Sequence, residues 1–210
     1  QARNEKTEDC GVVGIYSFDK TDISPFLYLG LQYIQHRGQD AAGMTIYDSN
    51  FHTTRGLGLI SNVITKRSLE QKGWIGIGHT RYPTTGHSTI NDVQPSTSEE
   101  TALAHNGHVA NYDDLKNALE TRGINLLTKV DSEVILRLFD EKKGSIEEKV
   151  KYIMKNIDGS YAVVAIFDNK LIAFRDPQGI RPLVFGKTKD HHRIMFASES
   201  CALSANGIYE

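Results

Sequence analysis

The sequence contains little cysteine, no long apolar run and almost no net charge. Its 210 residues include two cysteines, Cys10 and Cys201, and so low a count predicts thiols rather than a disulfide framework. The longest apolar runs, such as YAVVAIF at 161–167, are far shorter than the roughly 20 residues that cross a bilayer. The first nine residues are polar and lack the apolar stretch of a secretory signal. These absences predict a cytoplasmic protein with no membrane partner.

The charge balance excludes a further class of partner. With 24 Lys and Arg against 26 Asp and Glu, the formal net charge is -2. No basic face of the kind that binds nucleic acid is indicated. The length suits a single domain, and the sequence has no repeat or interdomain linker. Partners are therefore expected at specific sites rather than through the overall charge.

The apolar pattern predicts strands and helices in a mixed order. Strands are predicted for GVVGIY, AGMTIYD, GWIGIGHTRY, TALAHNG, RPLVFGK and RIMFASES, and a hairpin for SYAVVAIFDNKLIAFRD. Helices are predicted from Ser24 to Gly38, from Asn111 or Asp113 to Gly123, from Asp131 or Ser132 to Gly144, and from Ser145 to Asp158, the last with a Ser145–Glu148 capping box. Because this order departs from strict alternation of strand and helix, we expect an α+β fold with largely antiparallel sheets covered by helices.

Cys10 is the candidate nucleophile. A thiol with a pKa of about 8.5 is mostly protonated at neutral pH and needs a base to activate it. The α-amine of an N-terminal residue, with a pKa of roughly 7.7 to 8.0, suits that role, whereas an amide nitrogen does not. Removal of the first nine residues would place a thiol and its base on one residue. The alternative is a small buried residue at the start of a strand.

GHTRYPTTG at 78–86 places Arg81 where a predicted strand passes into a polar loop. The guanidinium fork of Arg81 suits a carboxylate, and Thr84 adds a hydroxyl three residues later. The loop from Pro83 to Glu100 is long for a compact domain, which indicates binding. The alternative is a surface arginine in a solvated loop.

AHNGHVAN at 104–111 offers two hydrogen-bond donors for an oxyanion, the side-chain amide of Asn106 and the backbone N–H of Gly107. The alternative is an ordinary Asn-Gly turn between two strands. VDSEVIL at 130–136 supplies Asp131, whose carboxylate suits a substrate ammonium or, alternatively, caps a helix. The neighbouring histidines lack the spacing of a zinc motif, so no metal site is predicted.

Seven motifs occur in the order found in class II glutamine amidotransferase domains, namely CGVVGIY, QHRGQDAAG, GHTRYPTTG, AHNGHVAN, DSEVIL, DGSYAVV and DPQGIRPL. Across nearly the whole chain the sequence resembles this family, and within it the glutamine phosphoribosylpyrophosphate amidotransferases. Three details carry the narrower resemblance: His-Arg-Gly within QHRGQDAAG, Tyr-Pro-Thr after Arg81, and DPQGIRPL.

The resemblance implies an N-terminal nucleophile hydrolase fold, a four-layer αββα sandwich of two mainly antiparallel sheets. It implies that Cys10 attacks the carboxamide of glutamine, while Asn106 and the Gly107 N–H hold the tetrahedral oxyanion. Glutamate leaves after hydrolysis of a thioester. Ammonia passes to a second active site, where it makes 5-phosphoribosylamine from phosphoribosyl diphosphate in purine biosynthesis.

The same resemblance assigns the substrate-binding residues. Arg81 and Thr84 receive the α-carboxylate of glutamine, and Asp131 receives its α-ammonium. Arg37 lies in the family's loop near the cysteine and helps to shape the site.

Two features depart from the family's pattern. Nine residues precede Cys10, so 1–9 reads as a propeptide-like leader and 10–210 as the glutaminase domain, inactive until the leader is removed. No acidic, glycine-containing diphosphate-binding loop follows Ile180, so the phosphoribosyltransferase domain, with its magnesium, is expected outside this chain or on another subunit. The iron-sulfur cluster of some relatives would need further cysteines, and the full enzyme is expected to be a homo-oligomer.

Two other functions remain open at this point. The chain could be the glutaminase domain of another class II amidotransferase, such as a glucosamine-6-phosphate synthase. It could also be a non-catalytic glutamine-sensing domain that keeps the pocket and never exposes its cysteine.

Overall fold

The computed structural model of the protein describes residues 10–82 and 89–209. Its first sheet contains β1 (Gly11–Ser17), β2 (Ala41–Tyr47), β3 (Phe51–Leu57), β4 (Ile75–Arg81), β9 (Val184–Lys187) and β10 (Arg193–Ala197). Its second sheet contains β5 (Ser96–Thr97), β6 (Thr101–Val109), β7 (Gly159–Phe167) and β8 (Lys170–Arg175). The helices are α1 (Ser24–Tyr33), α2 (Ile60–Val63), α3 (Lys66–Leu69), α4 (Tyr112–Thr121), α5 (Asp131–Glu141), α6 (Ile146–Asn156) and α7 (Ser200–Ala205), with 3₁₀ turns η1 (Gln35–Arg37) and η2 (Ile90–Asp92).

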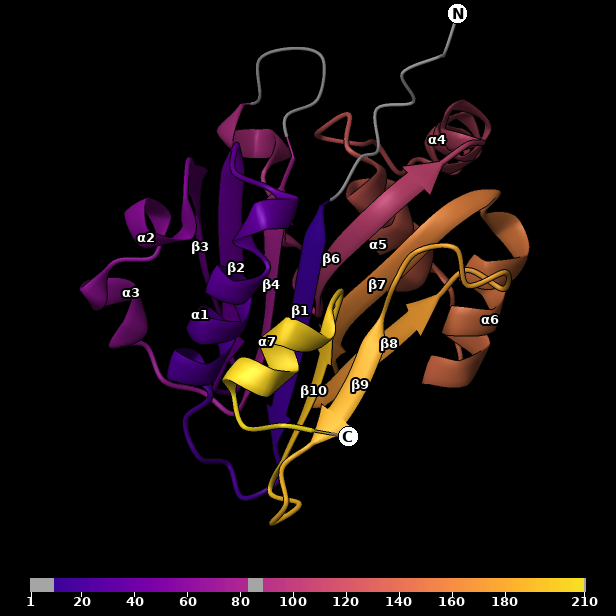
Figure 1. Ribbon diagram of the computed structural model, residues 1–210. Helices are drawn as coiled ribbons and strands as arrows, with labels where there is room; N and C mark the ends of the chain where they lie inside the picture. The colour runs from indigo at the N-terminus through magenta and orange to yellow at the C-terminus, as the bar shows by residue number, and fades with distance from the viewer. Residues whose placement is uncertain (1–9, 83–88, 210) are drawn as a thin grey trace, which may run out of the picture.

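The two sheets lie face to face between layers of helices (Figure 1). The six-stranded sheet has the order β3-β2-β4-β1-β10-β9 and the four-stranded sheet the order β5-β6-β7-β8, with antiparallel pairing between neighbours. Helices α1 and α7 pack on the outer face of the larger sheet, and α4, α5 and α6 on the outer face of the smaller one. The predicted α+β architecture of four layers is confirmed.

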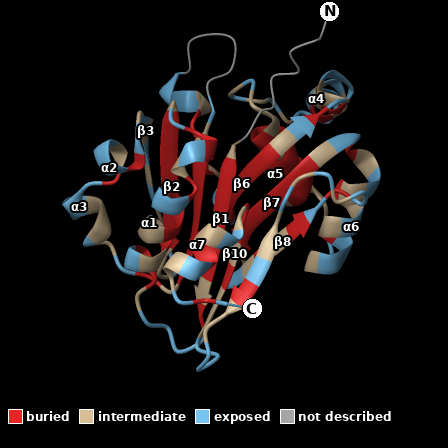
Figure 2. Cartoon of the chain, viewed as in Figure 1, coloured by how far each residue is buried: buried red, intermediate tan, exposed pale blue. Residues whose placement is uncertain are grey.

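Strand β1 lies near the middle of the larger sheet and is buried on both faces, which explains its almost continuous apolar sequence. Val12 faces the second sheet and packs in a cluster with Ile77 and Val164. Its neighbour Val13 faces the other way and packs in a cluster with Leu31 of α1. The period of two along the strand therefore builds two apolar layers at once. Figure 2 shows the buried residues concentrated in the strands of the two sheets.

Two glycines let α1 lie close to strand β4. A Cβ atom on Gly76 would overlap the side chains of Ile23 and Leu27, and one on Gly78 would overlap Leu31. The IGIG sequence at 75–78, which runs into the GHTRYPTTG motif, is thus a packing requirement of the outer layer. The antiparallel pairing of β1 with β4, in which Gly11 faces Thr80, places Arg81 at the same end of the sheet as Cys10.

The helix starts were only partly predicted. The capping box of α6 is confirmed, because Ser145 accepts a hydrogen bond from the Glu148 N–H while the Glu148 carboxylate accepts one from the Ser145 N–H. Ser24 is the first residue of α1 rather than its cap, since its hydroxyl donates to the Asp22 carboxylate and to a backbone carbonyl. That helix ends at Tyr33, earlier than expected, and a 3₁₀ turn follows it.

The caps proposed for α4 and α5 are also corrected. Asn111 occupies the N-cap position of α4, but its side chain instead bonds the backbone of Asn156 and Asp158 in the turn before β7. The N-cap of α5 is Val130, so neither Asp131 nor Ser132 caps that helix. The side chains of Asn111, Asp131 and Ser132 instead make contacts that are distant in the sequence.

All the predicted strands are present, and the predicted hairpin is β7–β8 with its turn at Asp168 and Asn169, both at positive φ. Strand β3, the two-residue strand β5 and the four-residue helices α2 and α3 were not predicted. Strand β3 lies at a sheet edge and carries only one clear apolar side chain at each end, which gave no period to detect.

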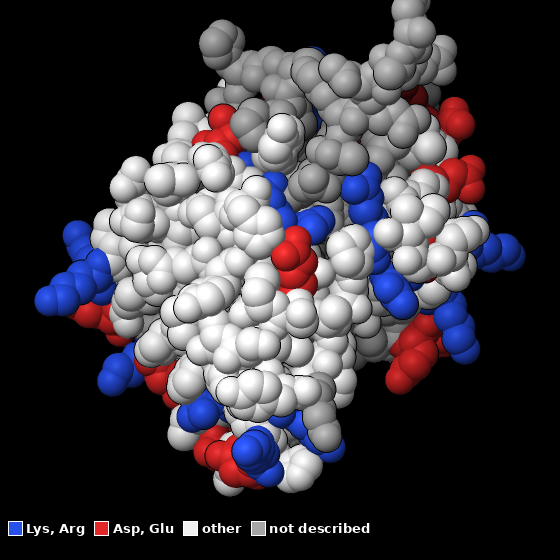
Figure 3. All heavy atoms as spheres, viewed as in Figure 1, with Lys and Arg blue, Asp and Glu red and all other residues white. Residues whose placement is uncertain are grey.

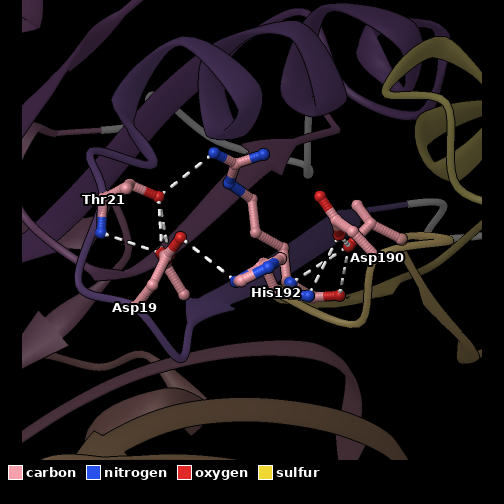
Figure 4. A network of polar contacts seen from close by, with 7 residues as sticks. Asp19, Thr21, Asp190 and His192 are labelled. Atoms are coloured by element: carbon pink, nitrogen blue, oxygen red, sulfur yellow. Dashed lines mark hydrogen bonds and ion pairs between the residues drawn. The ribbon is translucent and has the colours of Figure 1, made fainter.

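A polar network holds together the end of the molecule opposite Cys10 (Figure 4). The Asp19 carboxylate accepts hydrogen bonds from the hydroxyls of Ser17 and Thr21 and forms an ion pair with His192 at 3.2 Å. Hydrogen bonds from Ser17 and Thr21 hold the pKa of Asp19 well below its usual range. The network joins the β1–α1 loop to the β9–β10 turn. Within the described residues, none of the helices has the length and apolar character of a membrane span.

Candidate active site

Cys10 lies immediately before β1, at the mouth of a cavity of about 240 Å³. The cavity is lined by Cys10, His79, Arg81, Gln94, His105, Gly107, His108, Lys129, Val130 and Asp131. Four of the seven predicted site residues, Cys10, Arg81, Gly107 and Asp131, therefore meet in one hollow. Thr84 lies outside the described residues. Figure 3 shows Lys and Arg side chains gathered on this face close to the grey segments.

The backbone around Cys10 is held on two sides. The Arg37 Nε donates a hydrogen bond to the Cys10 carbonyl oxygen at 3.0 Å. The Val12 N–H donates to the hydroxyl of Ser198 at 2.9 Å, and the Ser198 N–H donates back to the Val12 carbonyl. Arg37 thus contacts Cys10 directly, through the Cys10 backbone.

Arg81 is the last residue of β4 rather than part of a solvated loop, which removes the alternative considered for it. Its guanidinium donates a hydrogen bond to the Asp92 carbonyl oxygen at 2.8 Å. A Cβ atom on Gly38 would overlap the backbone of Arg81, so only glycine lets the loop after η1 approach there. Both contacts fix the position of Arg81 at the cavity.

Asn106 and Gly107 lie inside strand β6, and not in a turn, which removes the Asn-Gly turn alternative. The Asn106 side chain is fully buried, and within residues 10–82 and 89–209 neither its amide nitrogen nor its amide oxygen has a hydrogen-bond partner. An unsatisfied buried amide costs about 1–3 kcal/mol, so its presence needs an explanation. Binding of an anionic oxygen by the amide N–H would supply one.

The register of β6 shows where the backbone N–H of Gly107 points. Within one strand, alternate N–H groups point to the same side. The N–H of His105 donates to Gln94 Oε1 at 2.7 Å, and the N–H of Val109 donates to Asp131 Oδ2 at 2.8 Å. Gln94 and Asp131 both line the cavity, so the N–H of Gly107, between these two, points toward it.

The partner strand supports the same direction for the Gly107 N–H. Tyr161 pairs with Gly107, yet its N–H and its carbonyl both bond Asp176 on the far side of β7. Gly107 and Tyr161 therefore form a non-hydrogen-bonded pair, so the Gly107 N–H does not bond to β7. Gly107 has φ +134°, and a Cβ atom there would overlap the Ser160 carbonyl oxygen.

Asp131 stands at the first turn of α5 and reaches across to the end of β6. Besides the bond from the Val109 N–H, its Oδ2 lies 3.6 Å from His108 Nδ1. Its side chain is 24% exposed. The carboxylate therefore ties helix to strand and still borders the cavity, which suits a cationic ligand.

His79 and His105 are buried beside the cavity and are neutral. Burial, together with the Arg81 charge, lowers the pKa of His79 to about 3. Burial and the nearby His79 and Arg181 lower the pKa of His105 to about 3. His79 Nε2 lies 3.1 Å from the His105 carbonyl oxygen, so it carries the proton. Among the described residues no group of His, Cys, Asp and Glu is arranged to hold a metal ion.

Sequence reasoning missed Gln94 and Lys129, which also line the cavity. Gln94 is positioned by the long loop before β5, where its backbone approaches so near that a side chain at Gly43 would overlap it. No pattern in the sequence connects Gln94 with His105, because their contact depends on how that loop folds. Lys129 directly precedes Val130 and Asp131, so its proximity could have been anticipated.

Residues 79–205 match the glutamine amidotransferase domain family. The amidophosphoribosyltransferase of Methanocaldococcus jannaschii is 38% identical over 204 residues, covering 93% of this chain and 43% of that protein. That of Methanothermobacter thermautotrophicus is 41% identical over 215 residues, covering 97% of this chain and 45% of that protein. The chain thus spans less than half the length of these curated relatives.

Solved structures give the same result. The chain resembles the glutamine phosphoribosylpyrophosphate amidotransferase from B. subtilis complexed with ADP and GMP, with a TM-score of 0.84 and 34% identity over 95% of this chain and 44% of that one. It resembles a structure described as the allosteric regulatory enzyme of purine biosynthesis with a TM-score of 0.86, at the same identity and coverage. The fold is that of the N-terminal nucleophile hydrolases. The chain therefore belongs to the glutamine amidotransferase domain family.

Proposed function

We propose that the cavity at Cys10 hydrolyses glutamine to glutamate and ammonia, with Cys10 acting as the N-terminal residue of the working form. The observation that carries this proposal is a pair of donors on two consecutive residues, of which Gly107 lines the same cavity as Cys10. The Gly107 N–H points toward the cavity outside the ladder, and the adjacent Asn106 amide is buried without a partner. Two such donors next to a thiol suit acyl transfer through a tetrahedral intermediate.

The reaction requires a base, and the α-amine of Cys10 is the proposed one. The amine takes the thiol proton as sulfur attacks the carboxamide carbon, and the oxyanion is held by Asn106 and Gly107. The protonated amine gives its proton to the leaving nitrogen, so ammonia departs and a thioester remains. A water molecule, deprotonated by the same amine, then attacks the thioester, releasing glutamate and restoring the thiol. With pKa values of about 3, the buried His79 and His105 are weak bases and leave this role to the amine.

The substrate contacts follow from the charges around the cavity. Arg81, held by the Asp92 carbonyl, presents its guanidinium to the α-carboxylate of glutamine. Thr84 is proposed to add a hydroxyl there. Asp131 accepts the α-ammonium while keeping its bond from the Val109 N–H. Glutamine is thus oriented with its carboxamide toward Cys10 and the two oxyanion donors.

The processing of the chain and the fate of ammonia complete the proposal. Residues 1–9 are removed as a propeptide-like leader, and 10–210 forms the glutaminase domain. Relatives named amidophosphoribosyltransferase are more than twice as long as this chain, so the remaining length is proposed to carry the phosphoribosyltransferase part. There ammonia reacts with phosphoribosyl diphosphate to give 5-phosphoribosylamine for purine biosynthesis, with magnesium bound to the diphosphate.

The test uses the full-length protein with Cys10 at its N-terminus. Glutamate release from glutamine is expected for the unmodified protein and is expected to be lost in Cys10→Ala. Product formation is then compared between phosphoribosyl diphosphate and fructose 6-phosphate as acceptors. Equal glutamate release by Cys10→Ala would contradict the proposed nucleophile. Product from fructose 6-phosphate alone would assign the domain to another amidotransferase, and no glutamate release at all would favour a glutamine sensor.

A further inference from the structure

The end of β10 contacts the segment around Cys10 through two consecutive residues. Ser198 exchanges hydrogen bonds with Val12, and the next residue, Glu199, binds Arg37. The Glu199 Oε1 lies 2.7 Å from Arg37 Nη1. The same Arg37 donates through Nε to the Cys10 carbonyl. The carboxylate and Cys10 are therefore linked through one guanidinium.

Arg37 is well placed to transmit this contact. It is only 9% exposed, so the orientation of its guanidinium depends on its partners. Among the described residues, Glu199 is the carboxylate that pairs with it. The backbone next to Arg37 is fixed as well, because Gly38 packs against the backbone of Arg81. Without Glu199 the guanidinium would lose the contact that aims its Nε at Cys10.

Glu199 also has partners that keep it ionised and fixed. Its Oε2 lies 2.9 Å from His36 Nε2, and the Cys201 thiol donates to the same carboxylate at 3.7 Å. Burial acts to raise the pKa of the Glu199 carboxyl, but the hydrogen bonds from Arg37 and His36 outweigh it and hold the pKa below its ordinary value. The carboxylate is therefore charged at neutral pH.

We propose that Glu199 is a positioning residue for the nucleophile, holding Arg37 on the Cys10 carbonyl and setting the charge felt by the thiol and α-amine of Cys10. This inference rests on the function proposed above. Glu199 does not line the cavity, so it touches no reacting atom. Its effect on catalysis is therefore indirect, through the position of Arg37 and through the field of its own charge at Cys10.

Two substitutions separate the effect of the position of Glu199 from the effect of its charge. Glu199→Ala removes both, so Arg37 is no longer held and kcat for glutamine hydrolysis is expected to fall on the order of tenfold or more, because a displaced nucleophile is costly. KM for glutamine is expected to stay unchanged, since the residues that border the substrate remain. Glu199→Gln keeps an oxygen for Arg37 and removes only the charge.

The effect of the Glu199 charge is measured through the pH dependence of Cys10 reactivity. Other groups facing this region are Arg37, His36 and Cys201 around Glu199, and His79, Arg81, His105, His108, Lys129 and Asp131 around the cavity. All of them are the same in Glu199→Gln and the unmodified protein. Loss of one nearby negative charge disfavours the protonated forms of the thiol and the amine. The pH profile of Cys10 reactivity is therefore expected to move to lower pH.

The experiment measures glutamine kinetics and the rate of Cys10 alkylation by iodoacetamide against pH, in full-length protein that begins at Cys10. Peptide masses separate Cys10 from Cys201. Glu141→Ala and Glu141→Gln are matched controls, because Glu141 pairs with Arg122 at the surface between α4 and α5. These controls are expected to match the unmodified protein in kcat and in the alkylation profile.

Two results would overturn the role of Glu199: a kcat in Glu199→Ala within twofold of the unmodified protein, or an alkylation profile in Glu199→Gln that does not move. If Glu199→Ala fails to fold, Glu199→Gln carries the same decision. Alkylation requires no glutamine. An unmodified protein that releases no glutamate therefore contradicts the proposed function, while the alkylation profile still decides the role of Glu199.

Discussion

The N–H of Val109 donates a hydrogen bond to Asp131 Oδ2 at 2.8 Å, joining the end of strand β6 to the first turn of α5. This bond places a carboxylate two residues along the strand from Gly107, on the side to which its N–H points. Strand β6 therefore positions both the carboxylate that binds the substrate cation and the N–H that donates to the oxyanion. Their spacing is fixed by the strand rather than by a loop.

Asp131→Asn is expected to weaken glutamine binding without unfolding the protein. The amide oxygen of asparagine still accepts the bond from Val109, but the negative charge opposite the α-ammonium is lost. A hydrogen bond to a charged group contributes about 1.5–3 kcal/mol, so KM should rise about 10-fold to 100-fold with little change in kcat. Steady-state kinetics with glutamine measure this. Asp113→Asn, in the exposed first turn of α4, should leave KM unchanged.

Asn106→Ala and Asn111→Ala are expected to have opposite effects. The Asn106 side chain makes no hydrogen bond to any part of the chain that the structure describes, so its removal should cost little stability but lower kcat about 100-fold to 1,000-fold through loss of an oxyanion donor. Asn111 bonds the backbone of Asn156 and Asp158, so its removal should lower the free energy of unfolding by about 1–2 kcal/mol and leave kcat unchanged.

Urea unfolding and glutamate release, measured on both asparagine variants, decide this comparison. A large loss of stability in Asn106→Ala with unchanged kcat would mean that Asn106 serves the fold and not an oxyanion.

Gly107→Ala is expected to disrupt the strand itself. Gly107 has φ +134°, and an added methyl group would overlap the Ser160 carbonyl oxygen of the neighbouring strand. Such strain costs of order 1–3 kcal/mol before any backbone shift is counted. The expected result is a lower Tm together with loss of glutamate release. Gly123→Ala is a suitable control, because that glycine also has positive φ but no atom lies near its Cβ position.

The buried histidines predict how stability depends on pH. The pKa values of His79 and His105 are about 3 in the folded protein, against 6.5 for an ordinary histidine. Below about pH 6.5 the unfolded chain therefore binds protons that the folded chain excludes, so the free energy of unfolding falls as pH falls toward about 3. Urea unfolding between about pH 7 and about pH 5, where carboxylates stay ionised, should show this loss.

Substitution of one buried histidine tests the cause. His105→Gln should flatten the dependence on pH over that range, whereas His191→Gln, at an exposed turn, should not. A slope that is the same in His105→Gln and the unmodified protein would contradict the assignment. An NMR titration gives a second readout, because the ring signals of His79 and His105 should not shift between about pH 5 and about pH 8.

The sequence was sufficient where local pattern and packing agree. The apolar run after Cys10 predicted β1 because that strand is buried on both faces, and Ser145 with Glu148 predicted the start of α6 because both partners of the capping box are local. Ser24, Asn111 and Asp131 were misjudged as caps for the opposite reason. Each side chain has a partner far along the chain, at Gln71, Asn156 and Val109 respectively, and Ser24 also donates to the nearby Asp22 carboxylate.

The site was predicted by motif and then assembled by tertiary structure. Cys10, Arg81, Gly107 and Asp131 were named from short motifs, but only the pairing of β1 with β4 and the packing of α5 on β6 bring them to one cavity. The direction of the Gly107 N–H and the contact of Glu199 with Arg37 could not be read from the sequence. One depends on strand register and the other joins residues 162 positions apart.

The central claim is that Cys10 acts through its own α-amine, and one comparison tests it most directly. Glutamate release is measured for two forms of the full-length protein, one beginning at Cys10 and the other retaining the single residue Asp9 before it. The account predicts that the form beginning at Cys10 releases glutamate and that the form with one extra residue does not, because its Cys10 nitrogen is an amide. Equal rates from the two forms would contradict it.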